Sequence, residues 1–335
     1  MLSGVEVLEA LCRRYAFHDV WALLPSAGLP DDELRRLRRL CLFGQRLLDL
    51  DAEDFDMADA EAGGAEYTEL VRRARRCRIP QEPRERDRGA LATMRPAYAL
   101  LLEVMAAQHM RHDMAALVAT AHMIAEYLPV LVWEPVWGHA ADPLRIGRDV
   151  RRRGSRFGSR DPECDHRRPD QNAAARILTI GKAPGEGWRA YLDRQHSNVA
   201  HALGVCAAEC RRPCGMVTAL PEEVRTDVGT RAAVAMAFGD SALIRLRHSA
   251  PVGHGFGVPS AEEVARTWDH TRTVLARRLP AAEVALRDDG YCLPGLPGLV
   301  SVVAGAPIVP DTLLRDTADL TVRKLHAALA VGERS

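Results

Sequence analysis

One histidine and three apolar residues share a face of the helix predicted from residue 188 to about residue 206. They are Leu192, His196, Val199 and Leu203. Spacings of three and four residues place side chains in one stripe of a helix, so His196 is directed toward the interior. Two interpretations of His196 stay open, a core histidine hydrogen-bonded to a backbone carbonyl or a metal ligand. A neutral imidazole in an apolar wall is also what a heme iron needs.

A second group of ionisable residues lies in the strongest helical signal, Ala90 to Leu128, which Pro129 is expected to end. His109 with Asp113, and His122 with Glu126, are neighbours at i,i+4 spacing. His112 falls on an apolar stripe and is predicted to point inward, whereas His109 lies partly off that stripe. A histidine here would move a proton near a bound oxidant. We predict His112, with His109 beside it, as the distal acid–base residue; a solvated or core histidine is the alternative.

Two metal sites of other kinds are weighed against this interpretation. A carboxylate–histidine iron site in a helical bundle would use Glu-x-x-His pairs, which the helix lacks. Cys206, Cys210 and Cys214 form a C-x3-C-x3-C array, which is not a zinc spacing. Eight cysteines in 335 residues are too few for a disulfide scaffold. We therefore interpret them as reduced structural thiols.

Two glycine-rich segments could contact an anion or a substrate. Residues 181–187 contain Lys182, one of two lysines in the chain, between a buried element and the helix that carries His196. Glycines let backbone amides approach a carboxylate or a propionate, although a plain turn is the alternative. Residues 248–257 combine His248, Ser249 and His254 with three glycines. This segment is interpreted as a substrate loop or as a tight connection.

The elements that position these residues are mainly α-helices. Ala, Leu and Arg are good helix formers, and helices are predicted through residues 5–50, from 260 to 278 and from 310 to 331. Residues 232–237 and 242–246 flank a turn and predict a small β-hairpin. We expect a single domain over residues 1–335, a helical bundle with this hairpin excursion and a long basic loop at 150–171.

Composition limits the classes of partner. The 45 basic and 45 acidic residues give no net charge, which argues against a nucleic-acid partner. The arginines of residues 145–168 leave an aminoacyl-tRNA-dependent transferase as an alternative, against a solvated loop. No apolar run of about 18 residues is uninterrupted, and the N-terminus does not resemble a secretory signal. We expect a soluble cytoplasmic protein with no membrane contact.

The helix that carries His196 resembles a known family. His196, Val199 and Leu203-Gly204, preceded by Trp188-Arg189, are similar to the proximal heme helix of the tryptophan 2,3-dioxygenase superfamily, over about 17 of 335 residues. The His-to-Val spacing is one residue shorter, and no Gly-Thr-Gly-Gly loop follows. Those departures resemble the branch that hydroxylates L-tyrosine. That branch's heme-attaching cysteine has no counterpart here, because four residues separate His201 from Cys206. His18 resembles an early distal histidine.

The resemblance implies a heme b enzyme that converts L-tyrosine to 3,4-dihydroxy-L-phenylalanine in antibiotic biosynthesis, with hydrogen peroxide or oxygen as oxidant. It implies a homo-oligomer in which His196 is the axial iron ligand. Expected cofactor contacts are Trp188, Lys182 and Arg189, and expected substrate contacts are His248, Ser249 and His254. Tryptophan dioxygenation is the nearest alternative. Outside the family stand the tRNA-dependent transferase, free of heme, and a non-catalytic helical binding protein.

Overall fold

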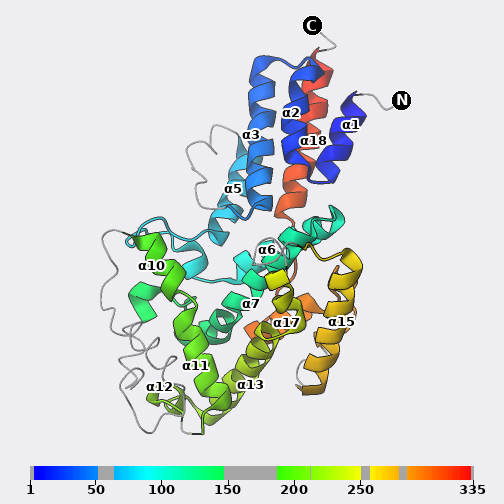
Figure 1. Cartoon of the computed structure of the whole chain (residues 1–335). Coiled ribbons are helices and arrows are strands. Elements are labelled where there is room, and N and C mark those ends of the chain that lie inside the picture. Colours follow the sequence, from blue (N-terminus) through cyan, green and yellow to red (C-terminus); the bar gives the residue numbers. More distant parts are fainter. Residues whose placement is uncertain are drawn as a thin grey trace.

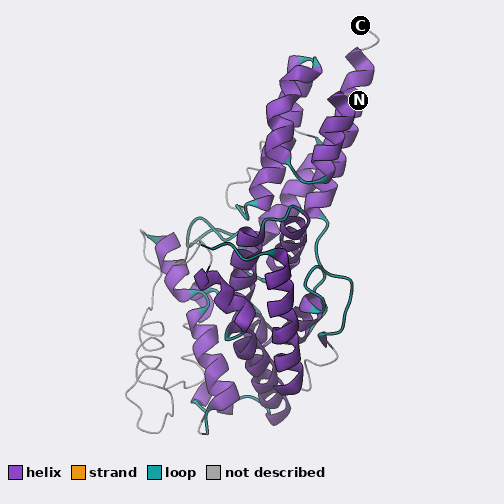
Figure 2. Ribbon diagram, turned by 45° about the vertical axis from the view of Figure 1, so that its right-hand side comes forward, coloured by secondary structure: helices purple, strands orange, loops and turns teal. Residues whose placement is uncertain are grey.

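The computed structural model describes residues 4–51, 64–146, 187–211, 213–249, 257–278 and 285–332. Within these ranges the regular elements are all helices, and no strand occurs among the described residues (Figures 1 and 2). The expectation of a mainly α protein is therefore confirmed. The long basic loop predicted at 150–171 lies outside the described residues.

The first group of helices gathers both ends of the described chain into one bundle (Figure 1). Its members are α1 (Gly4–Arg13), α2 (Phe17–Leu23), the 3₁₀ turn η1 (Leu24–Ala27), α3 (Asp31–Leu48), α5 (Ala65–Cys77) and α18 (Leu313–Gly332). Leucines of this helix recur at helical spacing, and four of them are buried: Leu37, Leu40, Leu47 and Leu48. They pack against α18 and α2, so residues far apart in the sequence share one apolar core.

The second group surrounds α7 and holds a separate apolar core. It comprises η2 (Gly89–Leu91), α6 (Arg95–Met110), α7 (Met114–Trp137), α10 (Trp188–Gln195), α11 (Asn198–Glu209), α12 (Gly215–Thr218), α13 (Glu222–Gly239), α14 (Ala242–Arg245), η3 (Leu246–Ser249), α15 (Ala261–Arg278) and α17 (Leu296–Ala304). Helix α7 packs against α6, α11, α13 and α17. Helix α6 joins the two cores, because Val104 belongs to the first and Met105 to the second.

Among the described residues, α7 is long and apolar enough to cross a membrane. Of its most apolar 18-residue window, 61% is buried inside the protein. The buried central helix of a globular protein has the same length and composition, so α7 is weak evidence for a membrane span.

The strongest helical signal, residues 90–128, is divided between two helices. Helix α6 ends at Met110 in a Schellman motif, in which His112 N–H donates to His109 O at 3.0 Å and Asp113 N–H donates to Gln108 O at 2.9 Å. His112 occupies the left-handed position of this motif, with φ 58°. Asp113 then caps α7 by accepting from Ala116 N–H at 3.1 Å. The break was missed because no glycine marks it.

Two further expectations are wrong. Pro129 does not end the helix: α7 continues through it to Trp137, held by packing on four neighbouring helices. The predicted β-hairpin is helical, because residues 232–237 belong to α13 and residues 242–246 to α14 and the start of η3. In α13, the apolar residues Val228, Ala232, Ala235 and Phe238 are buried at spacings of three and four residues. That period, with alanine's helix preference, outweighs the apparent alternation.

Candidate functional site

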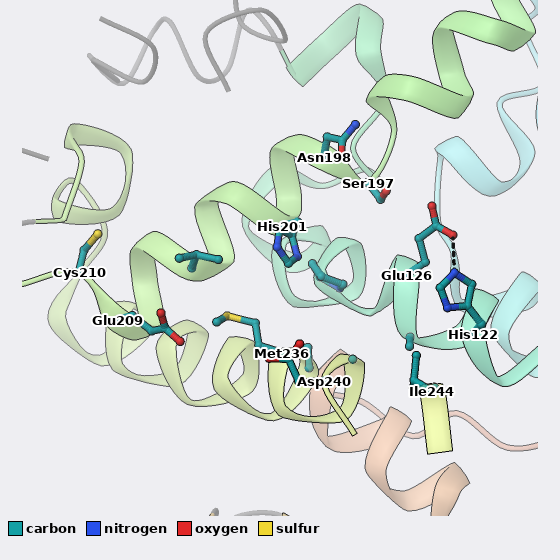
Figure 3. A pocket seen from close by; sticks show the side chains of 15 residues that line it. His122, Glu126, Ser197, Asn198, His201, Glu209, Cys210, Met236, Asp240 and Ile244 are labelled. Atoms are coloured by element: carbon teal, nitrogen blue, oxygen red, sulfur yellow. Dashed lines mark ion pairs between the residues drawn. The ribbon is translucent and has the colours of Figure 1, made fainter. Parts of the chain in front are cut away.

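A pocket of about 880 Å³ lies between α7, α11, α13 and α14 (Figure 3). Ligand pockets in proteins commonly enclose roughly 300–1,000 Å³. The lining residues are His122, Ala125, Glu126, Pro129, Ser197, Asn198, His201, Val205, Glu209, Cys210, Ala235, Met236, Gly239, Asp240 and Ile244. The pocket therefore combines an apolar part from all four helices with several ionisable side chains.

One end of the pocket holds a pair of ionisable side chains on α7. His122 Nε2 lies 3.7 Å from a carboxylate oxygen of Glu126, which confirms the i,i+4 pairing predicted from the sequence (Figure 3). The guanidinium of Arg247 also hydrogen-bonds His122 Nε2. A guanidinium only donates, so Nε2 accepts and a neutral His122 carries its proton on Nδ1. Arg247 thus fixes the tautomer of this histidine.

His201 lies on α11 between the two ends of the pocket (Figure 3). Its side chain is exposed, so the imidazole is accessible to a ligand in the pocket. At the other end lie Glu209 and Cys210, whereas Asp240 lies next to Met236, between that end and His122 (Figure 3). Arg245 lies beside Asp240, where its Nη2 donates to the backbone oxygen of Asp240 at 2.7 Å.

The electrostatic character of the lining is acidic. Glu126, Glu209 and Asp240 contribute three carboxylates, and no lysine or arginine is among the lining residues in the described part of the chain. A positively charged ligand group would be stabilised there.

His196 lies outside this pocket, at the C-terminal end of α10. Leu192, His196, Val199 and Leu203 are all buried, as their spacing predicts. The Nε2 atom of His196 lies 2.8 Å from the carbonyl oxygen of Ala140. A carbonyl only accepts, so Nε2 carries the proton. The structure thus shows a core histidine hydrogen-bonded to a backbone carbonyl, one of the two interpretations left open by the sequence.

The surroundings of His196 keep it neutral. Burial lowers the pKa of His196 to about 4, and the ring of Tyr127 lies 5.5 Å from the imidazole. Its Nδ1 atom is buried and has no hydrogen-bond partner among the described residues. An iron bound at Nε2 would have to replace the bond to Ala140. The axial role of His196 therefore stays a prediction that this arrangement does not favour.

The other predicted cofactor and substrate contacts are scattered or undescribed. Trp188 is buried and donates from Nε1 to Pro80 O at 2.8 Å, whereas Arg189 is exposed. Neither lines the pocket. The predicted contacts Lys182 and His254 lie outside the described residues, as do the side chains of His248 and Ser249, whose backbone forms part of η3.

The predicted distal histidines are not in the pocket. The prediction that His112 points inward is wrong: the Schellman turn takes it off the apolar stripe, and its side chain is exposed. His109 is half-buried and does not line the pocket either. His18 is exposed in the first bundle and stacks on Trp21, with ring centres 6.2 Å apart. The pocket instead contains His122 and His201.

Sequence reasoning missed the residues that make this pocket for different reasons. His122 and Glu126 carried a signal, their i,i+4 spacing, but were set aside for His112. His201 lies five residues after His196, about 140° away around a helix, so the stripe that favoured His196 excluded it. Asp240 lines the pocket and Arg247 contacts its His122, both from segments distant in the sequence, and no local sequence pattern predicts either contact.

Metal and heme binding can be tested against these residues. No group of three His, Cys, Asp or Glu side chains in the described ranges is arranged to hold a metal ion, so nothing there supports the carboxylate–histidine iron site. A heme needs one firm ligand and apolar walls. His201 supplies an accessible imidazole, and Pro129, Val205, Met236 and Ile244 supply apolar surface. The pocket residues thus fit a heme better than the surroundings of His196 do.

No family model matches the chain, and neither does any curated protein or solved structure.

Proposed function

We propose that the pocket between α7, α11 and α13 is the active site of a heme-dependent enzyme that hydroxylates an aromatic amino acid, with His201 as the iron ligand. The observation that carries the proposal is the position of His201. His201 is not the histidine of the motif that resembles a proximal heme helix, but it lies five residues further along the same segment and is accessible from a pocket of about 880 Å³. His196 lies in the same segment but is enclosed and bonded to Ala140.

A bound heme would supply the activation of peroxide or oxygen. The pocket's own residues would transfer protons and bind the substrate. Glu126, on the helix that faces His201, can take up and release a proton, and His122 lies beside it with Nε2 accepting from Arg247, so these two residues replace His112 and His109 as acid–base candidates. Arg247 keeps His122 in one tautomer. Arg247 and Arg245 lie beside the pocket, where they would balance the charge of the propionates.

The lining also supports an amino acid as substrate. The ammonium group of an amino acid would be stabilised by a lining carboxylate, Glu126, Glu209 or Asp240. Ser197 and Asn198 add neutral hydrogen-bonding groups for a substrate carboxylate. L-tyrosine is the proposed substrate on the resemblance alone, with hydrogen peroxide or oxygen as the oxidant, and tryptophan is the alternative.

A hemin titration of the purified full chain tests the proposal. The wild-type chain should bind close to one hemin, and His201→Ala should lose most of the Soret absorbance. His196→Gln should keep it, because that histidine is not in the pocket. His270→Ala, at an exposed position of α15, is the matched control and should bind hemin as the wild type does.

The outcomes separate the possible assignments. Loss of hemin binding in His196→Gln, with His201→Ala unchanged, would restore the axial role to His196. A wild-type chain that binds no hemin would remove the heme. The pocket would then remain a candidate site for an amine ligand, to be tested by titration with tyrosine and tryptophan. Neither the tRNA-dependent transferase nor the non-catalytic binding protein is favoured by a specific observation in the described residues.

A further inference from the structure

Three cysteines lie close to the C-terminal end of α11, and one of them, Cys210, lines the pocket. Cys206 is fully buried on α11, Cys210 follows the last residue of that helix, and Cys214 precedes α12. The chain turns back between the two helices and brings Cys214 against Cys206. The backbone N–H of Cys214 donates to Cys206 Sγ at 3.1 Å.

Metal binding does not account for this cluster. Among the described residues no three His, Cys, Asp or Glu side chains are placed to hold a metal ion. What the geometry does provide is the sulfur of Cys206 lying 3.1 Å from the backbone nitrogen of Cys214. A disulfide requires two cysteines at short range, and this contact brings the Cys206 sulfur next to the residue that carries the second thiol.

We propose that Cys206 and Cys214 form a reversible disulfide by exchange with a small-molecule disulfide, and that this bond fixes the end of the pocket formed by Glu209 and Cys210. Glu209 and Cys210 lie in the segment that the new bond would close, and both line the pocket. The bond would therefore tie the ligand site to the redox state of the protein. This inference does not rest on the proposed heme.

The order of the exchange follows from burial. The hydrogen bond with Cys214, together with burial, raises the pKa of the Cys206 thiol, so Cys206 stays protonated. Cys214 is half-buried and is the thiol that an oxidant can reach. Its thiolate attacks the oxidant, breaks the oxidant's S–S bond and releases one small thiolate. Cys206 then attacks the sulfur of Cys214, its proton passes to a released thiolate, and the second small thiol leaves.

The net reaction is balanced. Two protein thiols lose two protons and two electrons and become one disulfide, while one small disulfide is reduced to two thiols. A small dithiol reverses the reaction by the same steps.

Trypsin gives an unusually direct test, because its cleavage after Arg211 separates the two cysteines. Cys206 and Cys210 lie in the peptide of residues 195–211, and Cys214 lies in the peptide of residues 212–225. The full chain is incubated with oxidised glutathione, its free thiols are alkylated, and it is digested without reduction. Mass spectrometry should find most of the Cys214 peptide linked to peptide 195–211, and a dithiol should release it.

Four variants assign the link. Cys214→Ser and Cys206→Val should abolish it. Cys210→Ser should keep it, and in that variant the link can involve only Cys206 within its peptide. Cys292→Ser, at another half-buried cysteine, is the matched control and should change nothing.

The proposal is overturned if the wild-type Cys214 peptide carries only glutathione or a free thiol, or if the link persists in Cys206→Val. If Cys206→Val does not fold, as shown by loss of its far-UV circular dichroism, the Cys210→Ser variant alone tests the proposal. Loss of the linked peptide in Cys210→Ser would assign the disulfide to Cys210 and overturn the proposal. Hemin plays no part in this experiment, so its result is independent of the proposed function.

Discussion

His196 lies at the C-terminal end of α10 and His201 lies five residues later, on α11. The two histidines differ in burial, in hydrogen bonding and in access to a ligand. His196 is buried, bonded through Nε2 to Ala140 and held neutral by burial. His201 is exposed and borders a pocket whose lining includes three carboxylates. Apolar spacing identifies the histidine that is buried. It does not identify the one that a ligand can reach, because burial and access are opposite properties.

The largest expected effect concerns stability. His196→Ala should lower the free energy of unfolding by about 3–5 kcal/mol, because it leaves a cavity and removes the hydrogen-bond donor to the Ala140 carbonyl. His201→Ala should change it by no more than about 0.5 kcal/mol, as expected for an exposed helical position. Urea unfolding at pH 7 measures both. Equal losses in the two variants would contradict the comparison.

A second prediction uses pH. The unfolded chain protonates His196 near pH 6.5, whereas burial holds the folded pKa at about 4. Stability present above pH 6.5 is therefore lost as the pH falls toward 4, by about 3 kcal/mol in all. His196→Gln removes this dependence, so the difference in unfolding free energy between wild type and variant should shrink steadily over that range. A constant difference from pH 7 to pH 4 would show that the histidine is not held neutral.

Wild type must be compared with His196→Gln because the titration of Glu103 changes the free energy of unfolding with pH in the opposite direction. Glu103 is buried on α6 and accepts backbone N–H groups of Leu314 and Arg315 at the start of α18. Burial nonetheless raises its pKa to about 7. Its contribution to stability is therefore complete below pH 4.5 and is lost as the pH rises toward 7. Between pH 4.5 and 6.5 the two groups offset each other in the wild type.

The fold was predictable from the sequence where apolar residues follow a helical period without competition. Residues 31–48 form the predicted helix, and α15 and α18 begin within about three residues of the predicted positions. The prediction from the sequence was wrong where one residue or a short segment departs from the usual preference. Pro129 is tolerated because α7 is packed on several sides, and residues 232–246 contain too short an apolar alternation to separate a strand from a helix.

The pocket was less predictable than the fold because its residues come from four helices. His122 and Glu126 are neighbours in sequence, and their pairing could be predicted. The approach of His201 from α11, Asp240 from α13 and Arg247 from η3 depends on how the helices pack, which no spacing encodes. The choice of His112 failed for a smaller reason, a two-residue turn that shifts the phase between α6 and α7.

A substitution in that turn is expected to have the smallest effect on the free energy of unfolding. His112 has a φ of 58°, in the left-handed region that glycine adopts without strain, and its side chain is exposed. His112→Gly should therefore raise the free energy of unfolding by about 0.5–1 kcal/mol and leave hemin binding unchanged. His109→Gly, inside α6, is the matched control and should lose about 1 kcal/mol. If His112→Gly instead weakens hemin binding while raising stability, His112 contacts the ligand and belongs with His201 rather than with the solvent.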